Sequence, residues 1–132
     1  MGDRGYICIR NDEFCENSWI FLYTHWHGND LIENTKNGLK RLYDDYGVLD
    51  EGMRQASYIF FEMVKERGAY DFEIECHEYE SIEEIYEETL LYRLGHRLDI
   101  DTYILILEGS EINIFNYSSK VFTKTTIEKF IA

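Results

Sequence analysis

Residues 19–28 read Trp-Ile-Phe-Leu-Tyr-Thr-His-Trp-His-Gly, and this stretch decides the fold of the 132-residue chain. The apolar run at residues 19–23 predicts a buried strand, because a short apolar run bounded by turn signals is typical of the interior of a sheet. The glycine at position 28 predicts a turn directly after that strand. We therefore expect the two imidazoles and the indole of residues 25–27 to lie at a strand end, a position suited to a functional site.

The N-terminal residues predict the partner of this strand. Residues 4–10 are β-rich and alternate, with Ile7 and Ile9 on one face. A polar loop separates them from residue 19, so we expect the two segments to form an antiparallel hairpin. In an antiparallel pair the start of one strand lies opposite the end of the next, which places Arg4 near His25.

The rest of the chain alternates helices with strands. A helix is predicted from Asp30 to the stop at Gly47, and a second one from Asp50 to Gly68 with Met53 on its apolar face. Alternation at residues 70–76 predicts a strand with one buried and one solvated face, and residues 103–107 and 112–115 predict a hairpin across a glycine turn. Capping-box patterns at residues 81–84 and 125–128 predict two further helix starts, the first helix running toward Gly95.

The order of these elements predicts the fold class. Two strands, two helices, a strand, a helix, two strands and a helix favour a single α+β domain over residues 1–132. We expect a mixed or antiparallel sheet of about five strands with the helices packed on one face, because strand hairpins occur near both ends of the chain.

The charge of the chain restricts its partners. The formal net charge is −13, from 26 acidic and 13 basic residues. Direct binding to nucleic acid or to an anionic membrane needs clustered Lys and Arg, so we expect neither, and a basic partner would be attracted instead. No apolar run approaches the ~20 residues of a membrane span, and the first residues lack the apolar core of a secretory signal. We therefore expect a cytoplasmic protein.

Three segments carry a resemblance to known sequences. They are the opening Met1-Gly-Asp-Arg4, then Leu22-Tyr-Thr-His-Trp26 with Gly28, and then Ile59-Phe-Phe-Glu-Met-Val64. Together they resemble a set of small bacterial, archaeal and phage proteins that begin Met-Gly-x-Arg and carry a Tyr-x-His-Trp-x-Gly strand end. The resemblance covers the first half of the chain and implies a phage or mobile-element setting. The set usually has Gly or Asp where this chain has His27.

The strand end offers a candidate ligand-binding site formed by Arg4, His25, Trp26 and His27. The guanidinium would bind a phosphate and the indole would stack on a base, so the ligand would be a nucleotide. Two imidazoles at i and i+2 share a face of an extended strand, and a third ligand from His77, Cys76, Cys8 or a carboxylate would make a metal site. The alternatives are rings packed for structural reasons and an Arg4 that pairs with an acid such as Asp30. No phosphate-binding loop or dinucleotide fingerprint occurs, and we predict no cofactor.

The second candidate is an acidic segment at residues 71–88, which holds nine carboxylates and no Lys or Arg. One interpretation is a solvated strand face and helix surface. The other is a surface that imitates a phosphate backbone, with Tyr79 and Tyr86 between the acids, and that occupies a basic nucleic-acid channel of a partner. The predicted partner-binding residues are Glu73, Glu75, Glu78, Glu80, Glu83, Glu84, Glu87 and Glu88.

Enzyme chemistry has little support in the sequence. Ser18, Ser57 and Ser110 lack the nucleophile-elbow pattern, and Cys15 has no base near it in the sequence. We therefore expect a small acidic binding protein, an inhibitor or counter-defence factor that engages a basic, nucleic-acid-binding surface of a host protein. The alternative is a nucleotide-binding sponge or nucleotide-cleaving enzyme with its site at Arg4, His25, Trp26 and His27. A third interpretation, a homo-oligomer, depends only on the aromatic content.

Overall fold

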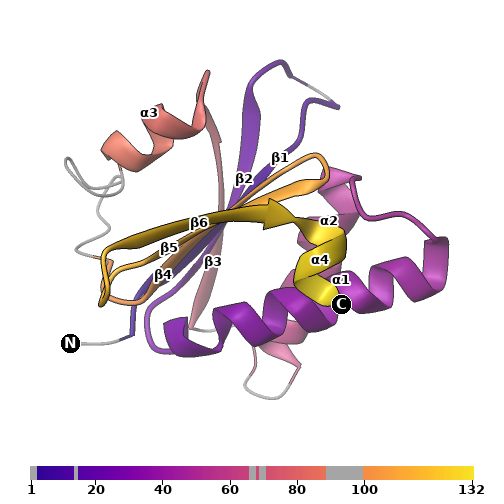
Figure 1. The fold of residues 1–132 in the computed structure, drawn as a ribbon, viewed down its shortest axis with the longest axis horizontal. Helices are drawn as coiled ribbons and strands as arrows, with labels where there is room; N and C mark the ends of the chain where they lie inside the picture. Colours follow the sequence, from indigo (N-terminus) through magenta and orange to yellow (C-terminus); the bar gives the residue numbers. More distant parts are fainter. Residues whose placement is uncertain (1–2, 14, 66–67, 69–70, 89–99) are drawn as a thin grey trace.

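The computed structural model describes residues 3–13, 15–65, 68, 71–88 and 100–132. Within these residues a mixed sheet of six strands has the order β3-β2-β1-β4-β5-β6 (Figure 1). The strands are β1 (Gly5–Arg10), β2 (Ser18–Thr24), β3 (Phe72–Glu78), β4 (Tyr103–Glu108), β5 (Glu111–Asn116) and β6 (Val121–Thr126). All neighbouring pairs are antiparallel except β1 and β4, which are parallel.

The predicted N-terminal hairpin is confirmed. β1 and β2 pair with Gly5 opposite Thr24 and Arg10 opposite Trp19. Every residue of β2 after Ser18 is buried, as the continuous apolar run predicts for a strand that is covered on both faces. The hairpin ends at the pair of Gly5 and Thr24, so Arg4 and His25 both lie at the end of the hairpin from which the chain enters its first helix.

One face of the sheet is covered by three helices. They are α1 (Leu31–Tyr46), which follows the short 3-10 helix η1 (Gly28–Asp30), α2 (Gly52–Val64) and α4 (Ile127–Ile131). Ile7, Ile9 and Leu22 of the sheet pack in this layer together with side chains of the helices. Gly38 allows α1 and α2 to approach closely, because a Cβ there would lie 2.9 Å from the Cα of Ile59.

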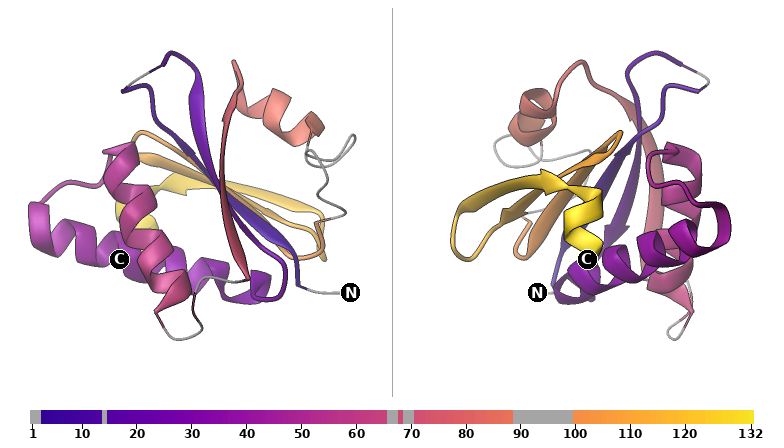
Figure 2. Two further views of the ribbon diagram at one scale, coloured as in Figure 1. Left: turned by 180° about the vertical axis from the view of Figure 1, so that it is seen from behind. Right: turned by 45° about the vertical axis from the view of Figure 1, so that its right-hand side comes forward.

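The opposite face is an aromatic layer covered by α3 (Ile82–Tyr86). Tyr6, Trp19, Phe21 and Tyr23 point to this side and pack with Ile85 of the helix. Figure 2 shows α3 on the other side of the sheet from α1, α2 and α4. The expected α+β fold is confirmed. The helices share one face as predicted, with the exception of α3. This helix lies on the second face because that face is also apolar and has to be buried.

The strand β6 is missing from the predicted order. Residues 121–126 read Val-Phe-Thr-Lys-Thr-Thr, which has no apolar periodicity, because β6 is an edge strand whose residues are largely exposed. The start of α4 also differs by one position. Thr126, and not Thr125, is the N-cap residue, and its hydroxyl accepts a hydrogen bond from the backbone N–H of Lys129 at 3.2 Å.

The strand β3 differs from its prediction in burial. Ile74, on the face expected to be buried, is 54 % exposed, and Cys76 is exposed too. The reason is the position of β3 at the edge of the sheet, beside β2 alone in the described part of the chain. The predicted stretches at residue 70 and from 89 toward Gly95 lie outside the described residues.

Two smaller expectations about the helices are also corrected. Asp30 occupies the N-cap position of α1, but its side chain forms no capping hydrogen bond. Met53, expected on the buried face of α2, is 41 % exposed, although its neighbour Gly52 lies against the backbone of Arg10 at the end of β1. Gly47 ends α1 as predicted, in the left-handed conformation with φ of 69°. None of the described helices is both long enough and apolar enough to cross a membrane.

Candidate functional site

The structure ties Arg4 to the segment that precedes β4. Its carbonyl oxygen accepts a hydrogen bond from the hydroxyl of Thr102 at 2.7 Å, and its backbone N–H donates to the carboxylate of Asp101 at 2.5 Å. Its guanidinium lies 4.0 Å from the same carboxylate. The acid that pairs with Arg4 is therefore Asp101, which the sequence did not indicate. The Nε atom of Arg4 is buried and has no hydrogen-bond partner in the part of the chain that the structure describes.

The residues His25, Trp26 and His27 lie where β2 ends. The Nδ1 atom of His25 is 3.4 Å from the hydroxyl of Tyr23, and its ring centroid is 4.5 Å from that of Trp26, which is 53 % exposed. His27 instead lies against Phe72, with its Nε2 atom 3.5 Å from the carboxylate of Asp71. The two imidazoles thus have different partners. Residues i and i+2 share a face only in an extended strand, and β2 ends at Thr24.

The sequence missed the structural role of Asp71. Its side chain is 2 % exposed, and its carboxylate accepts hydrogen bonds from the hydroxyl of Thr24 at 3.0 Å and from the N–H of Trp26 at 3.3 Å. A buried carboxylate is stable only when such donors surround it. Asp71 therefore belongs to the strand end, where it holds the turn after β2, and not to the acidic surface.

The additional metal ligands considered for His25 and His27 have other surroundings. Cys8 is buried in the aromatic layer, where burial raises the pKa of its thiol well above the usual value. His77 lies on β3 with its Nε2 atom 3.0 Å from a carboxylate oxygen of Glu75. Among the described residues, no group of three or more His, Cys, Asp or Glu side chains is arranged to hold a metal ion.

The predicted partner-binding acids follow β3 and α3, and we call them the acidic surface. Its members are Glu73, Glu75, Glu78, Glu80, Glu83, Glu84, Glu87 and Glu88. The N-cap half of the predicted capping box at the start of α3 is confirmed, because the hydroxyl of Ser81 accepts a hydrogen bond from the N–H of Glu84 at 3.2 Å. The carboxylate of Glu84 accepts a second one from the N–H of Glu80 at 2.9 Å. The segment between β3 and α3 is thus fixed in place.

A recess of about 240 Å³ lies at the junction of β3, α3 and the β1–β2 loop. Four carboxylates line it, those of Glu16, Glu78, Glu80 and Glu84, together with Asn17 and Tyr79. A backbone hydrogen bond of 3.0 Å from the N–H of Tyr79 to the carbonyl of Asn17 joins the loop to the end of β3. We call this feature the acidic recess.

Tyr79 belongs to the lining of the acidic recess, while its ring packs against Phe21 in the aromatic layer. Burial, and after it the negative charge of Glu88, raises the pKa of Tyr79 to about 12, so that its hydroxyl stays protonated at neutral pH. No sequence pattern connects Glu16 with the recess, because it is far from the acidic segment along the chain. The pairing of Ser18 with Glu78 is what brings the β1–β2 loop beside it, and a prediction of the β2–β3 register would have found it.

Comparison of the chain with protein-family models, with curated proteins and with solved structures gave no match in any of the three.

Proposed function

We propose that the chain is an inhibitor that binds a basic, nucleic-acid-binding surface of a host protein through its acidic surface. The observation that carries this proposal is the acidic recess, where four carboxylates from separate segments converge. The volume and the charge of the recess suit a guanidinium or an ammonium group of a partner, which carboxylates bind by charge-assisted hydrogen bonds. The resemblance of the first half of the chain to small bacterial, archaeal and phage proteins favours a counter-defence role.

Within the described residues, Glu75 of the acidic surface has His77 as a partner, 3.0 Å away, and six other members have no Lys or Arg partner. In the described parts of the chain, no Lys or Arg forms an ion pair with Glu78, Glu80, Glu83, Glu84, Glu87 or Glu88. By contrast, Glu62 on α2 pairs with both Arg41 and Lys65. Unpaired carboxylates in a row produce a field that attracts a basic partner and accelerates association, and salt weakens this attraction.

Reversing the charge of the acidic surface tests this proposal. We expect Glu83→Lys/Glu87→Lys/Glu88→Lys to weaken binding of a short oligo-arginine peptide by about tenfold or more, because like charges replace attractive ones. Glu84 stays unchanged so that the start of α3 remains intact. Fluorescence anisotropy with a labelled peptide at low and at physiological salt would measure this. A DNA duplex added as a competitor would show whether DNA and the acidic surface bind the same guanidinium groups of the peptide.

The matched control is Glu13→Lys/Glu33→Lys/Asp44→Lys, which changes the net charge by the same amount at exposed positions outside the acidic surface. We expect the control to weaken binding much less than the first variant. An equal loss in both variants would mean that the peptide responds to net charge alone, and the proposal would then be wrong.

A second candidate function is binding of a nucleotide at the strand end. Two observations favour it: the half-exposed indole of Trp26 lies 4.5 Å from the ring of His25 at a tilt of 60°, and the buried Nε atom of Arg4 has no hydrogen-bond partner among the described residues. A nucleotide would stack on the indole and pair its phosphate with Arg4. His27 is the less available member, since it lies against Asp71. Cleavage of the nucleotide would require water or a ribose hydroxyl as the nucleophile, with an imidazole such as that of His25 as its general base.

Thermal-shift measurements with a panel of cyclic nucleotides and divalent metal ions test the second candidate. A nucleotide present at about 100 times its Kd is expected to stabilise the folded chain by about 2.7 kcal/mol, with a corresponding rise in Tm. The Trp26→Ala variant should lose the shift, and the equally exposed Tyr43→Ala variant should keep it. A flat response across the panel would exclude this function for the ligands tested.

A further inference from the structure

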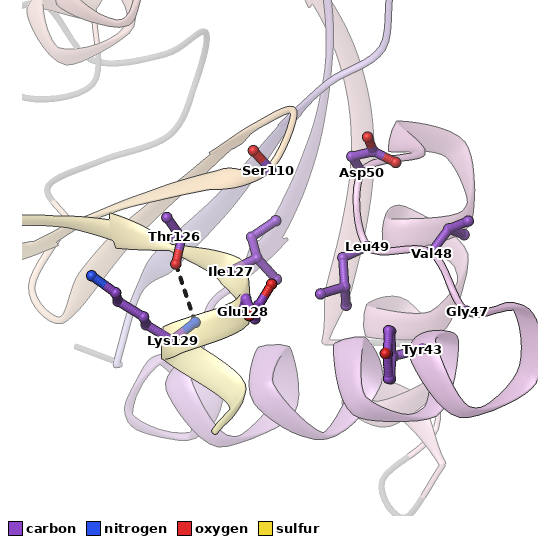
Figure 3. A pocket seen from close by; sticks show the side chains of 10 residues that line it. All are labelled: Tyr43, Gly47, Val48, Leu49, Asp50, Ser110, Thr126, Ile127, Glu128 and Lys129. Atoms are coloured by element: carbon purple, nitrogen blue, oxygen red, sulfur yellow. Dashed lines mark hydrogen bonds between the residues drawn. The ribbon is translucent and has the colours of Figure 1, made fainter.

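A second cavity, of about 550 Å³, lies on the helical side of the sheet, away from the acidic surface. Its lining comes from the end of α1, the α1–α2 linker, the β4–β5 turn and the start of α4 (Figure 3). No motif in the sequence indicated it, because these four segments meet only in the folded chain. Its volume is in the range of small-molecule sites, about 300–1,000 Å³.

Hydrogen bonds fix the walls of this cavity before any ligand binds. The side-chain amide of Gln55 donates to the carbonyls of Leu49 and Gly109, so that α2 holds both the linker and the β4–β5 turn. The N–H of Ile127 donates to the carbonyl of Ser110 at 2.8 Å, which attaches α4 to the same turn. Walls held in this way lose little conformational entropy on binding.

The lining combines an apolar floor with two carboxylates. Val48 and Leu49 are partly buried and Ile127 is fully buried, and together they form the floor beside the half-exposed ring of Tyr43. Asp50 and Glu128 flank the floor (Figure 3).

The carboxylates of Asp50 and Glu128 have no basic partner among the described residues. Neither forms an ion pair or a side-chain hydrogen bond within the described ranges of the chain, 3–13, 15–65, 68, 71–88 and 100–132. The lysine of the lining, Lys129, extends its side chain away from Leu49 and Tyr43 (Figure 3). The lining therefore carries two carboxylates beside apolar surface, with the ammonium group of Lys129 directed away from that surface.

We propose that this cavity binds a linear polyamine, in which protonated amino groups are joined by methylene chains. The two carboxylates would each bind an ammonium group, and the methylenes would cover the floor formed by Val48, Leu49 and Ile127. The ring of Tyr43 offers a face to a cation as well. The two carboxylates disfavour an anionic ligand, and a bare metal ion would leave the apolar floor unused.

Isothermal titration calorimetry with spermidine tests this proposal. We expect one molecule to bind per chain, and Asp50→Asn/Glu128→Gln to weaken binding by about tenfold or more, because both ammonium partners are lost. The matched control is Glu33→Gln/Asp44→Asn, which removes the same charge from exposed positions of α1 outside the lining. This control should bind spermidine with an affinity close to that of the unmodified chain.

Further measurements separate the cavity from general attraction to a negative protein. Amide resonances of Leu49 and Ile127 should shift with spermidine and stay in place with magnesium, which carries charge but no methylene chain. The proposal is overturned if spermidine does not bind, or if the cavity variant and the control lose affinity equally. It is also overturned if reversing Glu83, Glu87 and Glu88 abolishes the binding while the cavity variant retains it.

Discussion

Trp19→Ala is expected to lower the free energy of unfolding by about 3–5 kcal/mol, the usual cost of truncating a fully buried tryptophan. Trp19 has no exposed surface and lies in the aromatic layer with Phe21. Its indole N–H donates a hydrogen bond of 2.9 Å to the carbonyl of Tyr79, which leads from β3 to α3. The variant therefore loses both packing and the bond that positions the acidic recess.

Trp19→Phe separates these two effects. It keeps most of the apolar volume and removes the N–H donor, so we expect a loss of about 1 kcal/mol. Urea denaturation followed by circular dichroism measures both variants. If Trp19→Ala cost no more than Trp19→Phe, the aromatic layer would not be part of the packed core. Binding of the oligo-arginine peptide should weaken in Trp19→Phe as well, because Tyr79 lines the recess.

Gly28→Ala is expected to destabilise the chain by about 3 kcal/mol, the upper part of the usual range for forcing extra volume into a packed site. A Cβ at this position would lie 2.1 Å from the hydroxyl oxygen of Thr102 and 2.4 Å from the carbonyl oxygen of Asp3. Neither atom is free to move, since the carbonyl of Asp3 accepts a hydrogen bond of 2.6 Å from Gly28 itself and the hydroxyl of Thr102 donates to Arg4.

The neighbouring substitution Asn29→Ala serves as the control for Gly28→Ala. Asn29 is exposed in the same 3-10 helix, so its replacement should change the unfolding free energy by less than about 0.5 kcal/mol. Comparable stabilities for the two variants, measured by chemical denaturation, would contradict the close contact among Gly28, Asp3 and Thr102. Nucleotide binding at the strand end, if present, should also fall in Gly28→Ala, because Arg4 would lose its position.

The sequence predicted the elements whose cause is local. The apolar run of β2, the αL cap at Gly47 and the N-cap at Ser81 each depend on residues within one or two turns of chain, and all three are present. The strand β6 was missed for the opposite reason. Its pairing with β5 supplies the stability that its own side chains do not, so no apolar pattern marks it.

The candidate sites were predicted only in part, because their remaining members come from distant segments. Arg4 pairs with Asp101, and Glu16 joins the acidic recess through the β2–β3 register. In the sequence, Asp71 is one of the acids of a charged segment. In the structure, its carboxylate is buried and accepts hydrogen bonds from Thr24 and Trp26. Composition cannot distinguish a surface carboxylate from a buried one, since the difference lies in which donors the fold brings to it.

The parallel pairing of β1 with β4 has a consequence for how the chain acquires its structure during synthesis. Arg4 and Thr102, which are joined by a hydrogen bond, are 98 positions apart in the chain. The first hairpin therefore leaves the ribosome with one edge of β1 open, and it stays open until β4 has been made. Pairing over such a separation is slow, and an open edge is a template for association with other chains. The nascent protein depends on its C-terminal third to close the centre of its own sheet.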